Sequence, residues 1–200
     1  MPIFLIITIL FTLWLHYELK KNNREENKVS DDFWKREHDA NFVRPKDLST
    51  LSYITIDIES LPFHVSENDS IKEVEASILA LCDKKLLNLS GLSNTDIKYQ
   101  YGAKNFEMLS VFDQNFLLLL RHLNKWGKLL YEENHREDAK KVLLYAIFLG
   151  SDIKTTFSLL ARIYHEEGNI DQIRELLKKA ESLTTLLKPA LLEELSSYLS

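Results

Sequence analysis

The C-terminal part of this chain repeats its own pattern, and the spacing of the repeat constrains the fold more than any other feature. In each copy a small residue is followed by apolar and small residues at helical spacing, and the second copy keeps the order without a gap. The first copy contains Gly127, Leu130, Ala139, Leu143 and Ala146, and the second contains Ala161, Tyr164, Ile173, Leu177 and Ala180. We call the constant spacing between counterparts, as from Gly127 to Ala161, the repeat interval. It predicts two pairs of helices, over residues 120–153 and 154–187.

The packing within each pair follows from side-chain size. Gly127 and Ala161 leave room for two helices to approach closely. Asn134 and Gly168 occupy equivalent positions and suit the left-handed backbone that ends a helix. We expect the following large side chains to fill the interior: Trp126, Leu143, Tyr164 and Leu177.

These residues resemble two tetratricopeptide repeats (TPR), a family whose helical pairs stack into an α-α superhelix. The resemblance departs from the family pattern at Ile173, where alanine is usual. It implies a capping helix over residues 189–199, which begins with Pro189. Because such an array usually needs about three units, we expect helices over residues 70–87 and 97–111 to complete its core. An ordinary helical bundle with accidental self-similarity is the alternative.

The resemblance also implies where a partner binds, because in this family the concave face formed by the first helices of the pairs carries the binding site. The residues at the face-forming positions are Arg121, Asn124, Lys128, Tyr131, Thr155, Ser158, Arg162 and His165. Three cations and several hydrogen-bonding groups, with no carboxylate among them, suit an acidic peptide or a C-terminal carboxylate. A solvated helix face that binds nothing is the alternative.

The N-terminal segment contains an uncharged apolar run from Ile3 to Leu15. A helix over residues 3–19 that is apolar on all sides predicts a transmembrane anchor, assigned to residues 1–19. The flanking residues argue against a cleaved signal peptide, and a buried core helix is the remaining alternative. The positive-inside rule then predicts a single-pass protein of the cell membrane with its C-terminal domain in the cytoplasm. The cations that follow the run are Lys20, Lys21, Arg24 and Lys28.

Residues 20–69 are predicted to join this anchor to a helical domain over residues 70–200. The segment begins as a polar, solvated stalk. From Tyr53 to Ile58 apolar residues alternate with polar ones, and because no partner strand is visible we expect an extended arm whose isoleucines dock on helices. Ser70, with Glu73 three residues later, predicts the N-terminus of the first domain helix. The predicted fold class is therefore all-α: a transmembrane helix, a short extended juxtamembrane arm and a TPR-like α-α superhelical domain.

Composition and motifs exclude several functions. The net charge of -5 and the lack of a basic run argue against nucleic-acid binding. The single cysteine, Cys82, excludes a disulfide framework and a Cys-based metal site. The sequence contains no HExxH pair, Gly-rich phosphate loop or nucleophile elbow, so we predict no catalytic residue, metal or cofactor.

We therefore expect a membrane-tethered TPR-like scaffold or adaptor for a protein or peptide, and not an enzyme. Membrane contact is expected through residues 3–19. Two alternatives remain open at this point. One is a structural subunit of a larger membrane complex without a peptide groove, and the other is an enzyme with an unrecognised site.

Overall fold

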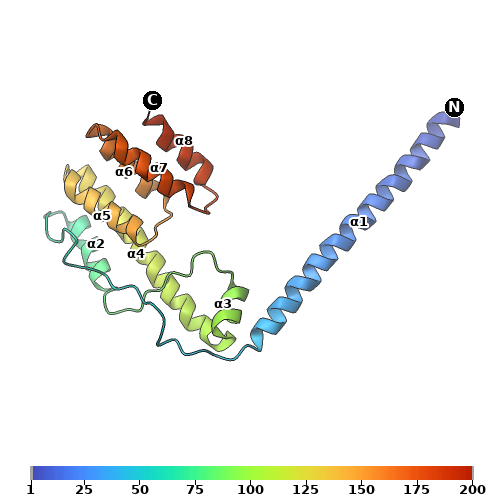
Figure 1. Ribbon diagram of the computed structural model, residues 1–200, viewed down its shortest axis with the longest axis horizontal. Coiled ribbons are helices and arrows are strands. Elements are labelled where there is room, and N and C mark those ends of the chain that lie inside the picture. Colours follow the sequence, from blue (N-terminus) through green and yellow to red (C-terminus); the bar gives the residue numbers. More distant parts are fainter. Residues whose placement is uncertain (1, 200) are drawn as a thin grey trace. The chain divides into compact units, whose positions relative to one another are not determined.

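The computed structural model describes the backbone of residues 2–199, and it describes their side chains apart from those of residues 2, 5 and 22–29 (Figure 1). This part of the chain is helical and contains no strand beyond one isolated bridge, between Ile54 and Leu86, which agrees with the predicted all-α class. The elements are α1 (Pro2–Asn41), α2 (Asp69–Leu79), α3 (Asn94–Tyr101), a short 3-10 helix (Ala103–Asn105), α4 (Phe106–Glu132), α5 (Arg136–Phe148), α6 (Lys154–Glu166), α7 (Ile170–Glu181) and α8 (Lys188–Ser197).

The predicted transmembrane anchor is wrong. Among the described residues, no helix combines the length and the apolar character needed to cross a membrane. The apolar run from Ile3 to Leu15 spans roughly 20 Å at 1.5 Å per residue, against a hydrocarbon core of about 30 Å. It is only the first part of α1, which continues without a break through Glu18 and Lys20 to Asn41. The predicted single-pass topology, with the protein in the cell membrane and its C-terminal domain in the cytoplasm, depended on this anchor and is wrong with it.

The chain forms two compact units. The first contains residues up to Thr50 together with Leu92–Glu107, and in it the C-terminal part of α1 packs on α3. Glu37 of α1 accepts a hydrogen bond of 2.6 Å from the Thr95 hydroxyl and forms an ion pair with Lys98. These bonds hold the Glu37 carboxyl pKa below its usual value, the Lys98 bond contributing most. Arg36 pairs with Asp96 at 3.0 Å.

The second unit contains Leu51–Gly91 and Met108–Ser200, and it holds the predicted repeats. Helices α5, α6, α7 and α8 follow one another in the chain, and each packs against the next (Figure 1). The turns after α4 and α6 are equivalent, as the repeat interval predicts. Asn134 has φ 65° and Gly168 has φ 71°. His135 N donates to Leu130 O at 2.9 Å, and at the equivalent position Asn169 N donates to Tyr164 O at 2.8 Å.

The interior of these helix pairs agrees with the prediction at three of the four large side chains. Trp126 and Leu143 are completely buried, and Tyr164 is buried apart from its edge. The prediction for Leu177 is wrong, because this side chain is only half-buried at the border of the apolar stripe. Its neighbour Leu176 is buried instead.

Helix α8 continues the same register beyond the two predicted pairs. It begins at Lys188, one repeat interval after Lys154 begins α6. Its buried residues Leu191 and Leu195 correspond at this interval to Phe157 and Ala161, which are also buried. By position and packing, α8 is therefore a third helix of the same type as α6.

The segment before α2 is extended, and two of its three alternating isoleucines dock as predicted. Ile56 is buried and Ile54 packs against the core. Ile58, by contrast, remains exposed. The predicted arm is therefore present, and only Ile54 and Ile56 of its isoleucines dock on the helices.

The helices that were expected to complete the core are shorter than predicted. Helix α2 starts before the expected Ser70, because Asn68 is the N-cap and its side chain accepts from Ser70 N at 2.8 Å. It ends at Leu79 rather than near residue 87. The helix expected over residues 97–111 is interrupted at Gly102, whose φ of 91° ends α3. Only α2 joins the core of the second unit, since α3 belongs to the first.

The close approach of α4 and α5 gives a first prediction. Leu143→Ala should lower the free energy of unfolding by about 2–5 kcal/mol, because it opens a cavity at a fully buried site. Leu144→Ala, at a side chain that is 38% exposed, is the matched control and should change it by less than about 1 kcal/mol. Urea denaturation of both variants measures the difference, and equal effects would contradict the packing.

Gly127→Ala tests the same contact from the other helix. An added Cβ would lie 2.7 Å from Leu143 Cδ2. This overpacking should lower the free energy of unfolding by about 1–3 kcal/mol, which outweighs a gain of up to about 1 kcal/mol from the higher helix propensity of alanine. In the Leu143→Ala background the clash is absent, so the same substitution should become stabilising. Urea denaturation of the single and double variants measures this change of sign. If Gly127→Ala has the same effect in both backgrounds, the two residues are not coupled.

Candidate functional site

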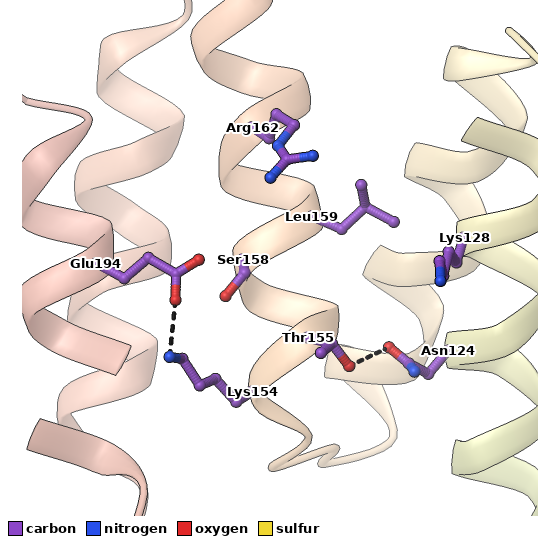
Figure 2. A pocket seen from close by; sticks show the side chains of 8 residues that line it. All are labelled: Asn124, Lys128, Lys154, Thr155, Ser158, Leu159, Arg162 and Glu194. Carbon is purple, nitrogen blue, oxygen red and sulfur yellow. Dashed lines mark hydrogen bonds and ion pairs between the residues drawn. The ribbon is translucent and has the colours of Figure 1, made fainter. Parts of the chain in front are cut away.

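A groove of about 530 Å³ lies along α6 between α4 and α8. Its lining residues are Asn124 and Lys128 from α4, Lys154, Thr155, Ser158, Leu159 and Arg162 from α6, and Glu194 from α8. Figure 2 shows α6 in the middle, with Glu194 on one side of it and Asn124 and Lys128 on the other. The repeat interval explains this arrangement, because it places a helix of the same type on each side of α6.

Five of the eight predicted partner-binding residues line this groove: Asn124, Lys128, Thr155, Ser158 and Arg162. The other three do not. Arg121 is exposed on α4. The Tyr131 hydroxyl donates to Glu166 Oε1 at 2.6 Å, and the His165 ring lies 5.3 Å from the ring of Tyr198.

Asn124 of α4 is held in one orientation by two hydroxyl groups of α6. Its Oδ1 accepts a hydrogen bond of 3.0 Å from Thr155 (Figure 2). It accepts a second hydrogen bond of 3.0 Å from Thr156. Thr156 is completely buried, so this connection lies at the base of the groove. With its oxygen bonded in this way, the Asn124 amide nitrogen keeps its two N–H donors for another acceptor.

Sequence reasoning missed three lining residues, Lys154, Leu159 and Glu194. Lys154 lies one turn before Ser158, so extending the predicted stripe on α6 by one turn would have found it. Leu159 lies next to that stripe. Glu194 is missed because residues 189–199 were predicted only to cap the array.

Glu194 and Lys154 form an ion pair of 2.9 Å across the groove, and each side chain is 32% exposed. Burial alone would raise the pKa of the Glu194 carboxyl, but the hydrogen bond from Lys154 and the nearby Ser158 and Arg162 hold it below its usual value. The Ser158 oxygen is enclosed beside this carboxylate and makes no hydrogen bond of standard geometry. The groove therefore contains a carboxylate in addition to the predicted residues, none of which is acidic.

Arg162 and Lys128 have different surroundings from Lys154. The Tyr198 hydroxyl, followed by that of Tyr131, raises the pKa of the Arg162 guanidinium. Among the described side chains no carboxylate lies within ion-pair distance of this guanidinium. Lys128 faces Glu132 at 3.6 Å, and both side chains are more than half exposed, so this pair is weak.

The groove can therefore recognise an anion and hydrogen-bond an acceptor. Its lining contains three cations and one carboxylate, which leaves an excess of positive charge. Within the described part of the chain, His, Cys, Asp and Glu side chains do not gather in a group of three or more that could hold a metal ion.

Comparison of the chain with models of known families, with curated proteins and with solved structures finds no match in any of the three.

The Lys154–Glu194 pair gives a prediction for pH dependence. Because the folded protein lowers the Glu194 pKa from 4.5, the pair stabilises the fold above that pH, and this contribution disappears as the pH falls through the folded value. Glu194→Gln should therefore lower stability at pH 7, by no more than about 1 kcal/mol for a partly exposed pair, and by less near pH 3. Denaturation at both pH values, with the exposed Glu193→Gln as control, measures this. A difference between wild type and Glu194→Gln that does not change with pH would contradict it.

Proposed function

We propose that this chain is a TPR-like protein-interaction module and that the groove between α4, α6 and α8 binds an acidic peptide segment. The single observation that carries the proposal is the charge and donor pattern of the groove. Among the described residues Arg162 forms no ion pair with a carboxylate, although Glu194 interacts with it at longer range, and Lys128 has only a weak ion pair. A partner carboxylate would supply the missing partner through charge-assisted hydrogen bonds.

The arrangement of donors favours a peptide over a small anion. The Asn124 amide can donate to a peptide carbonyl group while Arg162 and Lys128 hold a carboxylate. Leu159 supplies an apolar contact between them. A peptide offers all three kinds of group in one extended segment, whereas an inorganic anion offers one.

The repeated helical pairs support the same function. Stacked helices that each bury a closely packed interior form a rigid support, which lowers the entropy lost when a partner binds. The turn geometry follows the repeat interval, and so does the interior of the pairs except at Leu177.

The test is a binding measurement with labelled peptides of four glutamates, one set with a free C-terminal carboxylate and the other amidated. Lys128→Ala combined with Arg162→Ala should weaken binding by about tenfold or more, because each removes a charge-assisted hydrogen bond. Affinity for the wild type should also fall as salt rises. Fluorescence anisotropy measures both effects.

Lys125→Ala is the matched control, because Lys125 is an exposed cation of α4 that does not line the groove. It should retain wild-type affinity, and Arg121→Ala should resemble it. A free carboxylate that binds much more tightly than the amide would assign the site to peptide C-termini, and equal binding would assign it to acidic side chains. If the double variant binds both peptides as the wild type does, the groove is not the site.

A further inference from the structure

The groove already contains a carboxylate of the chain itself. Glu194 comes from α8 and reaches Lys154 on the neighbouring helix, with 2.9 Å between Oε2 and Nζ (Figure 2). The pair lies within the same groove as Lys128 and Arg162. One of the three groove cations is thus occupied by the kind of group that an acidic peptide would offer.

We infer that Glu194 is an internal competitor that controls which acidic partners the groove accepts. This inference rests on the proposed function, because it concerns the same groove and the same guest. A peptide carboxylate that binds Lys154 has to displace Glu194. A peptide that does not reach Lys154 binds only at Lys128 and Arg162, beside a fixed negative charge.

Displacement occurs at the side chain and not by movement of the helix. Leu191 and Leu195 are completely buried and hold α8 in the core. Glu194 and Lys154 are each about one-third exposed, so the carboxylate can turn into solvent without disturbing those contacts. A partly exposed pair of this kind is weak, so a guest with a well-placed carboxylate can replace it.

The competitor affects selectivity as well as affinity. Glu194 repels any guest carboxylate that approaches without replacing it, because like charges in a partly enclosed groove are poorly screened. Segments with one acidic residue therefore lose more affinity than segments with several acidic residues. In the second kind of segment, one carboxylate can bind Lys154 in place of Glu194. The groove should for this reason prefer clustered acidic residues over a single one.

The experiment compares wild type, Glu194→Gln and Glu193→Gln in binding the labelled peptide of four glutamates and a peptide of the same length with one glutamate and three glutamines. Glu194→Gln keeps the side-chain shape and removes the charge. It should bind the four-glutamate peptide roughly fivefold more tightly. Its gain in affinity over the wild type should be larger for the single-glutamate peptide than for the four-glutamate peptide. Glu193→Gln makes the same change in net charge on the exposed side of α8 and should leave both affinities unchanged.

Lys154→Ala shows whether the higher affinity of Glu194→Gln depends on the ion pair between Lys154 and Glu194. In a Lys154→Ala background, Glu194→Gln should give a smaller gain in affinity than in the wild type, because the substitution then frees no lysine for the guest and only Lys128 and Arg162 remain. Circular dichroism and urea denaturation confirm that each variant is folded.

The outcomes separate this inference from the proposed function. If Glu194→Gln binds no more tightly than wild type while the Lys128/Arg162 double variant loses binding, the groove is the site and Glu194 is not a competitor. An equal gain in Glu193→Gln also overturns the inference, because the effect is then one of net charge. If no variant binds either peptide, the proposed function is wrong, and the inference is wrong with it.

Discussion

Helices α4 and α5 approach each other so closely at Gly127 that an added Cβ would lie 2.7 Å from Leu143 Cδ2. The other features of the second unit depend on this contact. Trp126, the neighbour of Gly127 in α4, is fully buried, and Asn134 with its left-handed backbone lies in the turn that joins the two helices. In the next helix pair α6 packs on α7 with a buried Ala161 in place of Gly127, although Leu177, the counterpart of Leu143, is only half-buried. Because each pair packs on the next in the same way, α4, α6 and α8 become neighbours, and only then can side chains from all three line one groove.

This dependence explains which features could be predicted from the sequence. The turns at Asn134 and Gly168 and the buried positions Trp126 and Leu143 are set by local geometry and side-chain size, which residue identity reveals directly. The groove residues Asn124 and Thr155 also follow, because they lie on the helix faces opposite the buried stripes. Leu177 shows the limit of the approach. Both Leu176 and Leu177 are apolar, and the interval alone does not determine which of two adjacent leucines lies at the centre of a stripe and which at its border.

The remaining errors concern features that depend on distant parts of the chain. The apolar run at Ile3–Leu15 was interpreted without the rest of its helix, whereas α1 carries the same backbone hydrogen bonding on through charged residues to Asn41. Glu194 was missed because its role depends on where a third helix packs, which a two-copy alignment does not contain. Leu191 and Leu195 carried the necessary signal, since they match Phe157 and Ala161 at the same interval. Extending the register by one more helix would have placed a carboxylate beside the predicted cations.

The groove also shows how the contacts that hold the helices together determine what they can bind. Asn124 Oδ1 is bonded to the hydroxyls of Thr155 and Thr156, so the contact that ties α4 to α6 also fixes the amide donors in place. Lys154 and Glu194 tie α6 to α8 in the same way, but with a weak ion pair at a partly exposed position. In the binding that we propose, one side of α6 is organised before a guest arrives, and the other exchanges its own carboxylate for the carboxylate of the guest. Preorganised donors lower the entropy lost on binding, and an exchangeable ion pair makes affinity depend on the charge of the guest. In this proposal the groove gains affinity from the side facing α4 and selectivity from the side facing α8.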